Sequence, residues 1–147
     1  METLTLTEKK GDLFEAGTNL AHCISADAKM AAGIAKTFVR KFGRQAFRER
    51  VLEQNGKIGD AVAIPCGSVY IYNLITKEFY YQKPTYEALR EALVSMRDHA
   101  VANEIVSIAI PHIGCGLDRL EWSKVREIII DVFSDTKIAI TAFSIDQ

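Results

Sequence analysis

A nearly continuous apolar run at residues 105–110 constrains the fold of this chain more than any other segment. Such a run is typical of a strand buried on both faces, which proteins use in parallel sheets covered by helices. A glycine-rich loop follows, and then a helical pattern that places Trp122, Val125, Ile129 and Val132 on one face. A strand-like segment comes last, at residues 137–143. These residues therefore predict a strand–loop–helix–strand unit.

The preceding residues alternate strand patterns with helical ones. Strands are predicted at residues 3–7, 20–24, 61–64 and 69–75, with a hairpin turn at residues 65–68 between the last two. Helices are predicted from Gly33 to a stop at Gly43, at residues 45–54, and from an N-cap at Thr85 to an end at Asn103. This alternation predicts an α/β domain of three layers with a largely parallel sheet.

The composition indicates one soluble domain spanning residues 1–147. Of the 147 residues, 48% are hydrophobic and 25% are charged, a usual balance for a globular protein with its own core. The formal net charge of −1 provides no long-range attraction for nucleic acid, so a polyanion partner would need a local basic patch. The sequence has neither the apolar core of a signal peptide nor a run long enough to span a membrane.

The cysteines and histidines do not predict a metal site. The chain has three cysteines, which are Cys23, Cys66 and Cys115. Because their number is odd and no C-x-x-C spacing occurs, the sequence predicts neither a disulfide framework nor a structural zinc site. This cysteine usage favours a reducing, cytoplasmic compartment. A metal-ligand spacing is also missing from the histidines, which are His22, His99 and His112. We expect a monomer without metal or organic cofactor.

The ends of three predicted strands are candidates for a ligand site, because ligands of such sheets bind at the carboxyl ends of strands. Two loops at these ends contain glycine, and they are Met30-Ala31-Ala32-Gly33-Ile34-Ala35 and Gly114-Cys115-Gly116. Glycines let backbone N–H groups approach a phosphate, and a helix start adds positive potential. Two such loops at one edge would suit a diphosphate. Tight turns and close helix–sheet packing are the structural alternatives.

Three acidic and basic residues are candidates for recognition and catalysis. Asp12 could accept a hydrogen bond from the amine of a base, or it could bond to its own backbone in a turn. Lys77 and Asp118 could share a cleft, with the lysine attacking an anomeric carbon and the carboxylate moving protons. The alternative for this pair is two solvated loop charges. Cys115 is a weaker candidate nucleophile, because its backbone N–H is the more useful group in that loop.

Six motifs follow one another along nearly the whole chain. They are Gly11-Asp12-Leu13-Phe14, Ala21-His22-Cys23-Ile24-Ser25-Ala26-Asp27, Met30-Ala31-Ala32-Gly33-Ile34-Ala35, Leu74-Ile75-Thr76-Lys77, Lys83-Pro84-Thr85-Tyr86-Glu87 and Ile113-Gly114-Cys115-Gly116-Leu117-Asp118-Arg119-Leu120. In this order and spacing they resemble the macrodomain family, in the branch of terminal ADP-ribose protein glycohydrolase and its bacterial antitoxin relatives.

The resemblance implies a three-layer α/β/α macrodomain with a mixed, largely parallel sheet and with ADP-ribose in a cleft across the strand ends. It assigns Asp12 to the adenine amine, residues 25–35 to the distal ribose and diphosphate, and residues 114–117 to the phosphates. It also implies that Lys77 attacks the anomeric carbon of the distal ribose and that Asp118 helps release the adduct. The implied ADP-ribose contacts are Asp12, Leu13, His22, Ser25, Met30, Ala31, Gly33, Ile34, Ala35, Thr76, Pro111, Ile113, Gly114, Cys115, Gly116 and Leu117.

Two residues depart from the family pattern. Ala31 stands where glycine is expected, and its methyl group could crowd the distal ribose. His112 stands where the vertebrate relative is expected to have arginine, which could change substrate contacts. The Asn-rich loop of other hydrolase macrodomains is absent, so their water-activating mechanism is not implied.

The resemblance predicts a hydrolase that removes ADP-ribose from acidic-residue esters on protein or from nucleobases on DNA. A reader that binds ADP-ribose without turnover is one alternative. An enzyme for ADP-ribose 1″-phosphate or O-acetyl-ADP-ribose is another. A nucleic-acid-binding domain would require one basic face, and the candidates for it are Arg40, Lys41, Arg44, Arg48 and Arg50. A solvated helix surface is the alternative for that cluster.

Overall fold

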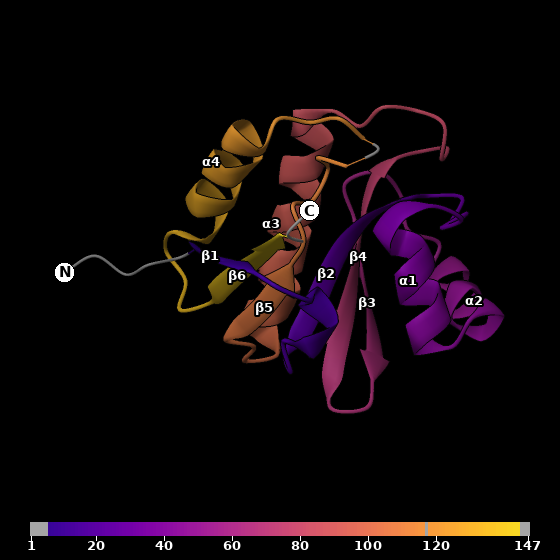
Figure 1. The fold of residues 1–147 in the computed structure, drawn as a ribbon, viewed down its shortest axis with the longest axis horizontal. Helices are drawn as coiled ribbons and strands as arrows, with labels where there is room; N and C mark the ends of the chain where they lie inside the picture. Colours follow the sequence, from indigo (N-terminus) through magenta and orange to yellow (C-terminus); the bar gives the residue numbers. More distant parts are fainter. Residues whose placement is uncertain (1–5, 117, 145–147) are drawn as a thin grey trace.

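A computed structural model describes residues 6–116 and 118–144 of the chain (Figure 1). Residues 3–5 of the first predicted strand and the predicted phosphate contact Leu117 therefore lie outside the described residues. Within these residues the chain forms six strands, four α-helices and one 3₁₀ helix. In chain order they are β1 (Leu6–Lys10), η1 (Leu13–Glu15), β2 (Asn19–Ser25), α1 (Gly33–Phe42), α2 (Gln45–Glu53), β3 (Ala61–Cys66), β4 (Val69–Lys77), α3 (Tyr86–Ala102), β5 (Ser107–Ile110), α4 (Trp122–Phe133) and β6 (Ala139–Ser144).

The sheet is mixed and largely parallel, which confirms the predicted fold class. Its strand order is β1-β6-β5-β2-β4-β3. Every neighbouring pair is parallel except β3 and β4, which form the predicted hairpin. Because five strands run in one direction, their carboxyl ends meet at the same edge of the sheet. Candidate ligand-binding segments from distant parts of the sequence are thereby brought to one edge.

Helices cover both faces of the sheet, and this gives the predicted three layers. On β4, Ile71 packs into a core cluster with Phe38 of α1 and Phe47 of α2. The next residue, Tyr72, packs into a second cluster with Leu89 of α3 and residues of α4. Successive strand residues point to opposite faces, so the two clusters lie on opposite sides of the sheet.

The helix boundaries follow from local signals in the sequence. Thr85 caps α3, and its hydroxyl oxygen accepts a hydrogen bond from the N–H of Ala88 at 3.0 Å. Gly43 ends α1 with φ of 129°, a conformation that residues with a side chain rarely adopt. Both predictions are confirmed.

The predicted strand at residues 105–110 is shorter than expected. β5 begins at Ser107, because the N–H of Ile105 donates to the carbonyl of Ala100 at 2.9 Å and closes the end of α3. Val106 is 61% exposed, and full burial begins only at Ile108. The hairpin turn is also tighter than predicted, since Pro65 and Cys66 belong to β3. Proline is accommodated there because β3 is an edge strand.

Candidate active site

A cleft of about 590 Å³ lies where β2, β4 and β5 end. Small-molecule sites usually measure about 300–1,000 Å³. Its walls come from the segments that follow these strands and from the first turn of α1. Most of the predicted ligand contacts and both predicted catalytic residues line it, namely Ser25, Met30, Ala31, Gly33, Ile34, Ala35, Lys77, Pro111, Ile113, Gly114, Gly116 and Asp118.

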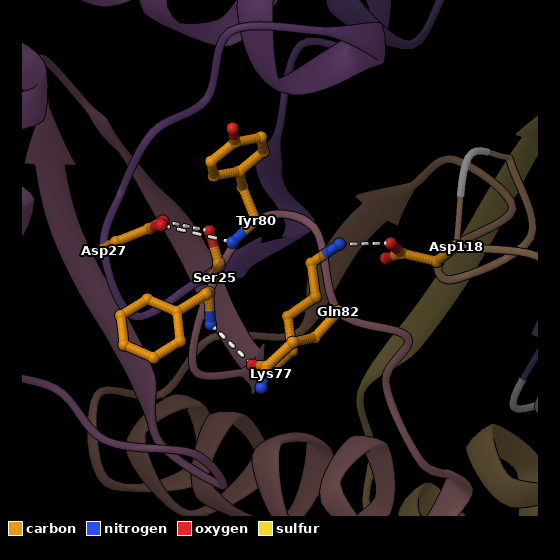
Figure 2. A network of polar contacts seen from close by, with 7 residues as sticks. Ser25, Asp27, Lys77, Tyr80, Gln82 and Asp118 are labelled. Atoms are coloured by element: carbon orange, nitrogen blue, oxygen red, sulfur yellow. Dashed lines mark hydrogen bonds and ion pairs between the residues drawn. The ribbon is translucent and has the colours of Figure 1, made fainter.

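Lys77 and Asp118 form an ion pair inside this cleft. Lys77 is the last residue of β4, and Asp118 follows the glycine-rich loop after β5. The ammonium nitrogen Nζ lies 2.5 Å from Oδ1 of Asp118, as Figure 2 shows. The two side chains are only 13% and 16% exposed. The pair is therefore a partly desolvated acid–base pair, and the alternative of two solvated loop charges does not describe it.

Asp27 joins the end of β2 to the loop that follows β4. Its carboxylate accepts hydrogen bonds from the Ser25 hydroxyl and from the backbone N–H groups of Lys29 and Tyr80. Figure 2 shows Asp27 and Ser25 on one side of Lys77 and Asp118 on the other. Burial alone would raise the pKa of Asp27, but these hydrogen bonds hold the pKa below its usual value. Asp27 thus stays ionised and fixes the wall of the cleft beside Lys77.

The first turn of α1 lines the cleft. Gly33, Ile34 and Ala35 all line the cavity. The N-cap residue, Ala32, has no side-chain hydrogen bond that would satisfy the backbone N–H groups of this turn. Gly33 has φ of 61°, which glycine adopts at little cost. An uncapped helix N-terminus offers free donors and positive potential, so this end of α1 can bind an anion such as a diphosphate.

The glycine-rich loop after β5 forms the opposite wall. Gly114 has φ of 72°, and its carbonyl accepts from the N–H of Leu120 at 2.7 Å. A Cβ at Gly114 would lie 2.8 Å from Cδ1 of Leu120, so the Leu120 side chain would have to move. The positive φ is the stronger reason for glycine at this position. The N–H of Cys115 already donates to the carbonyl of His112 at 3.1 Å. This amide could donate to a phosphate only if its hydrogen bond to His112 were broken.

The Cys115 side chain does not behave as a nucleophile. Its Sγ donates to the carbonyl of Ile113 at 3.3 Å, and burial raises the pKa of the thiol to about 11. A protonated thiol is a poor nucleophile. Cys115 is also absent from the residues that line the cleft. Lysine therefore remains the stronger candidate.

A second cavity of about 760 Å³ adjoins the first. Gly33, Ile34 and Pro111 line both cavities, so the two form one elongated groove. The far end contains the predicted contacts Asp12 and Leu13. Asp12 Oδ1 accepts from the N–H of Phe14 at 2.9 Å and caps η1. The turn alternative for Asp12 is thus confirmed, while the second carboxylate oxygen can still accept from a ligand amine.

Other predicted contacts lie away from both cavities. His22 is fully buried in β2, as its strand pattern predicts, and its ring stacks on Phe38 at 3.8 Å. Its Nε2 donates to Asn73 Oδ1 at 2.6 Å, because the Asn73 amide nitrogen donates to backbone carbonyls. Thr76 is buried next to Lys77. The resemblance predicts that His22, Thr76 and Cys115 contact ADP-ribose, and this stays a prediction.

The cleft also contains residues that the sequence reasoning did not select. They are Cys23, Ile24, Tyr80, Tyr81 and Gln82. The available signal was the aromatic run after β4, because exposed aromatic residues in a loop at a strand end often contact ligands. His112 lines the cleft as well, and its ring stacks on Trp122 at 4.0 Å.

The basic residues of α1 and α2 do not form one free face. Arg48 donates to the carbonyl of Ala28 at 2.8 Å, and Arg50 donates to that of Pro65 at 2.7 Å. Lys41 lies over the Phe14 ring and lines the second cavity. These side chains tie the helices to neighbouring segments, which argues against a nucleic-acid-binding face there.

In the part of the chain that the structure describes, His, Cys, Asp and Glu side chains do not gather in threes as a metal site would require. No helix there combines the length and hydrophobicity needed to cross a bilayer. The three cysteines are free thiols.

Known proteins resemble this chain over nearly its whole length. ADP-ribose glycohydrolase OARD1 of Bos taurus is 44% identical over 142 residues, which cover 95% of this chain and 91% of that protein. The macrodomain of Mycobacterium tuberculosis DarG superposes with a TM-score of 0.86 at 21% identity, covering 96% of this chain and 98% of that one. Thermosipho africanus DarTG, solved in complex with ADP-ribose, superposes with a TM-score of 0.84 at 19% identity, covering 97% of this chain and 42% of that one.

The family assignment rests on sequence as well as on fold. The model of the Macro domain family matches residues 21–129, which include most of β2, all of β4 and β5, and the ion pair between Lys77 and Asp118. The structural superpositions independently show the same fold. The chain belongs to the Macro domain family.

Proposed function

We propose that this protein is a hydrolase that removes ADP-ribose from a modified macromolecule, with Lys77 as the nucleophile. The observation that carries the proposal is the partly buried pair of Lys77 and Asp118 at one end of the groove. A pure reader would need donors and a complementary shape, but not an amine and a carboxylate in contact at the sugar end. The 44% identity to a protein named ADP-ribose glycohydrolase supports the same activity.

We propose that ADP-ribose lies along the groove, with its adenine, diphosphate and distal ribose in successive parts of it. We place the adenine near Asp12, whose carboxylate can accept from the exocyclic amine. The diphosphate then lies at the uncapped start of α1, where the helix dipole favours negative charge. The distal ribose reaches the cleft that holds Lys77 and Asp118. The macromolecule attached to that ribose leaves through the open side of the cleft.

The chemistry requires a neutral amine. Asp118 can take the proton from Lys77, because its carboxylate oxygen is 2.5 Å from Nζ. The Nζ lone pair then attacks the anomeric carbon of the distal ribose, and the bond from that carbon to the carrier breaks. The leaving group takes the bonding electrons. Water next adds to the same carbon as the Asp118 carboxylate takes its proton, and Nζ departs as it regains a proton, which frees ADP-ribose.

Release of ADP-ribose tests this proposal directly. The substrates are a protein modified on acidic residues and a single-stranded DNA modified on thymidine. Wild type is compared with Lys77→Ala and with Lys124→Ala, a matched control whose lysine pairs with Glu121 away from the cleft. We expect release by wild type and by the control, and none by Lys77→Ala. Binding of ADP-ribose without release by wild type would instead indicate a reader or an enzyme for small ADP-ribose metabolites.

Action as a monomer in the cytoplasm is part of the same proposal. Three free cysteines suit a reducing compartment. A groove formed within one chain does not need a second subunit to complete it. Sedimentation at micromolar concentration should give the mass of one chain, and a dimer mass would overturn this part.

A further inference from the structure

Three consecutive aromatic side chains stand exposed beside the catalytic cleft. Phe79, Tyr80 and Tyr81 come one residue after the end of β4 and are 41%, 55% and 71% exposed. Tyr80 and Tyr81 line the cavity that contains Lys77. Large aromatic surface left open to water next to a ligand site is typical of a contact surface. We call these three residues the aromatic platform.

The aromatic platform is held in a defined conformation. Asp27 Oδ2 accepts from the N–H of Tyr80 at 3.1 Å. Gln82 accepts from the N–H of Phe79 at 2.8 Å through its side chain, and its own N–H donates to the Phe79 carbonyl at 3.1 Å. Tyr80 and Gln82 line the same cavity as Lys77. These hydrogen bonds fix the backbone that carries the rings, which lowers the entropic cost of binding.

The rings offer flat faces rather than a pocket. Phe79 and Tyr81 are nearly parallel, with an interplanar angle of 3° and centroids 5.7 Å apart. Tyr80 stands at 89° to Tyr81. The backbone N–H groups of Phe79 and Tyr80 are already occupied by Gln82 and Asp27. An extended peptide would therefore find few main-chain donors here, whereas a base needs only a ring face on which to stack.

The charges nearby suit a nucleic acid strand of modest affinity. Lys29 Nζ lies 5.4 Å from the centre of the Tyr80 ring, and Lys83 is exposed just after the platform. Glu78, also exposed, opposes them. With a chain net charge of −1, general attraction for a polyanion is small. Stacking and the bound ADP-ribose would have to supply most of the affinity.

We propose that the aromatic platform stacks an unpaired base of a single-stranded nucleic acid that carries the ADP-ribose on a neighbouring nucleotide. The proposal rests on the function proposed above and names the substrate class. The platform begins two residues after Lys77, so a base adjacent to the modified nucleotide would reach it as the distal ribose enters the cleft. The platform would then select nucleic acid over protein as the carrier.

The experiment uses three ADP-ribosylated probes and free ADP-ribose. The probes are a short single-stranded DNA, the same strand with an abasic residue on either side of the modified nucleotide, and a glutamate-linked peptide. Wild type is compared with Phe79→Ala and Phe79→Trp, because Phe79 stacks on Tyr81 but does not line the cleft. The control is Val101→Ala, which removes exposed apolar surface on α3. The readout is KM where ADP-ribose is released, and Kd by fluorescence anisotropy where wild type releases none. If the protein proves not to be a hydrolase, the Kd values still show whether a base stacks on the platform.

We expect Phe79→Ala to raise the KM or Kd for the intact strand about 5- to 100-fold, as loss of one stacked base does. The abasic strand should bind wild type as weakly as the intact strand binds Phe79→Ala, while the peptide and free ADP-ribose should be unaffected. Phe79→Trp should bind like wild type. Three results would each overturn the proposal. They are an equal loss of affinity for all ligands, equal affinity for the intact and abasic strands, and a loss of affinity confined to the peptide.

Discussion

Lys77 Nζ and Asp118 Oδ1 are in contact at 2.5 Å although 41 positions separate the two residues in the chain. The contact arises because β4 and β5 end at the same edge of the sheet, on either side of β2. Lys77 is fixed by the strand that it ends, whereas Asp118 is carried by a loop that Gly114 shapes. Lys77 is thus held by a strand and Asp118 by a turn, so mutation can change either residue separately.

Asp118→Asn should slow both transfer of the sugar to Lys77 and its release from Lys77. Asparagine keeps the shape but cannot take a proton, and loss of a general acid or base usually costs about 10²–10⁴-fold in rate. We expect turnover to fall by this factor, and a covalent adduct with the mass of one ADP-ribose to persist longer on the variant than on wild type. Mass spectrometry of the intact protein after mixing with substrate measures this. Full activity without an adduct would remove Asp118 from the mechanism.

Ala31→Gly should tighten ADP-ribose binding. Ala31 lines the cleft where the distal ribose is placed, and relief of one crowding methyl group is worth about 1 kcal/mol, or about fivefold in Kd. The variant should lose less than about 1 kcal/mol of stability through added backbone freedom. Calorimetry of ADP-ribose binding checks the first effect. The matched control is Ala32→Gly, and the same gain there would assign the effect to the backbone instead of the methyl group.

Asp27→Asn should loosen the loop that follows β4. The carboxylate uses both oxygens, one for Ser25 and Lys29 and the other for Tyr80, whereas asparagine has only one acceptor oxygen. Loss of a hydrogen bond to a charged group costs about 1.5–3 kcal/mol, so exchange of the Tyr80 amide proton should quicken by about tenfold or more. Asp60→Asn is the control, since Asp60 accepts from Lys57 in a different loop. Unchanged exchange at Tyr80 would show that other contacts hold the loop.

Local signals predicted the elements, but not the partners at the site. The Thr85 cap and the Gly43 stop act within one turn of chain, and both are confirmed. The link between Asp27 and Tyr80 spans 53 positions and depends on the pairing of β2 with β4, which no local pattern specifies. The strand at residues 105–110 was predicted too long, because the sequence does not show that Ile105 closes α3.

The glycine-rich loop shows the same limit. Its glycines predicted close backbone approach, but not that the Cys115 amide bonds to His112 within the loop. Nor did they predict which helix start faces the ligand. The start of α1 lines the cleft, whereas the N-cap residue of α4, Glu121, donates its N–H to the Tyr86 hydroxyl at 3.0 Å. Only the folded chain distinguishes these two helix ends.

Gly114→Ala and Gly116→Ala should differ in stability. At Gly114 an added Cβ would meet Leu120 at 2.8 Å, and alanine in the left-handed region costs about 1–2 kcal/mol by itself. At Gly116 the added Cβ meets open space, so the change should stay within about 0.5 kcal/mol. Urea unfolding of the two variants measures the difference. Equal stability would mean that the turn adjusts to a side chain at Gly114.

His22 should make the protein less stable in mild acid. Burial lowers the pKa of His22 to about 4, against a smaller opposing effect of its hydrogen bond to Asn73. The unfolded chain has an ordinary histidine pKa of about 6.5, so between these values only the unfolded state binds the proton. Stability is therefore complete above about pH 6.5 and falls as pH drops towards 4, by about 2 kcal/mol between pH 7 and pH 5. Urea unfolding at both pH values measures this fall.

The control for that measurement is His22→Gln, whose amide can still donate to Asn73 but does not titrate. Carboxylates contribute to the pH dependence of both proteins, so the difference between wild type and variant isolates His22. We expect the variant to start less stable at pH 7, because glutamine cannot stack on Phe38 as the imidazole does, and to lose about 2 kcal/mol less on acidification. Parallel pH profiles would show that His22 takes up its proton without unfolding, and would place the acid sensitivity in another group.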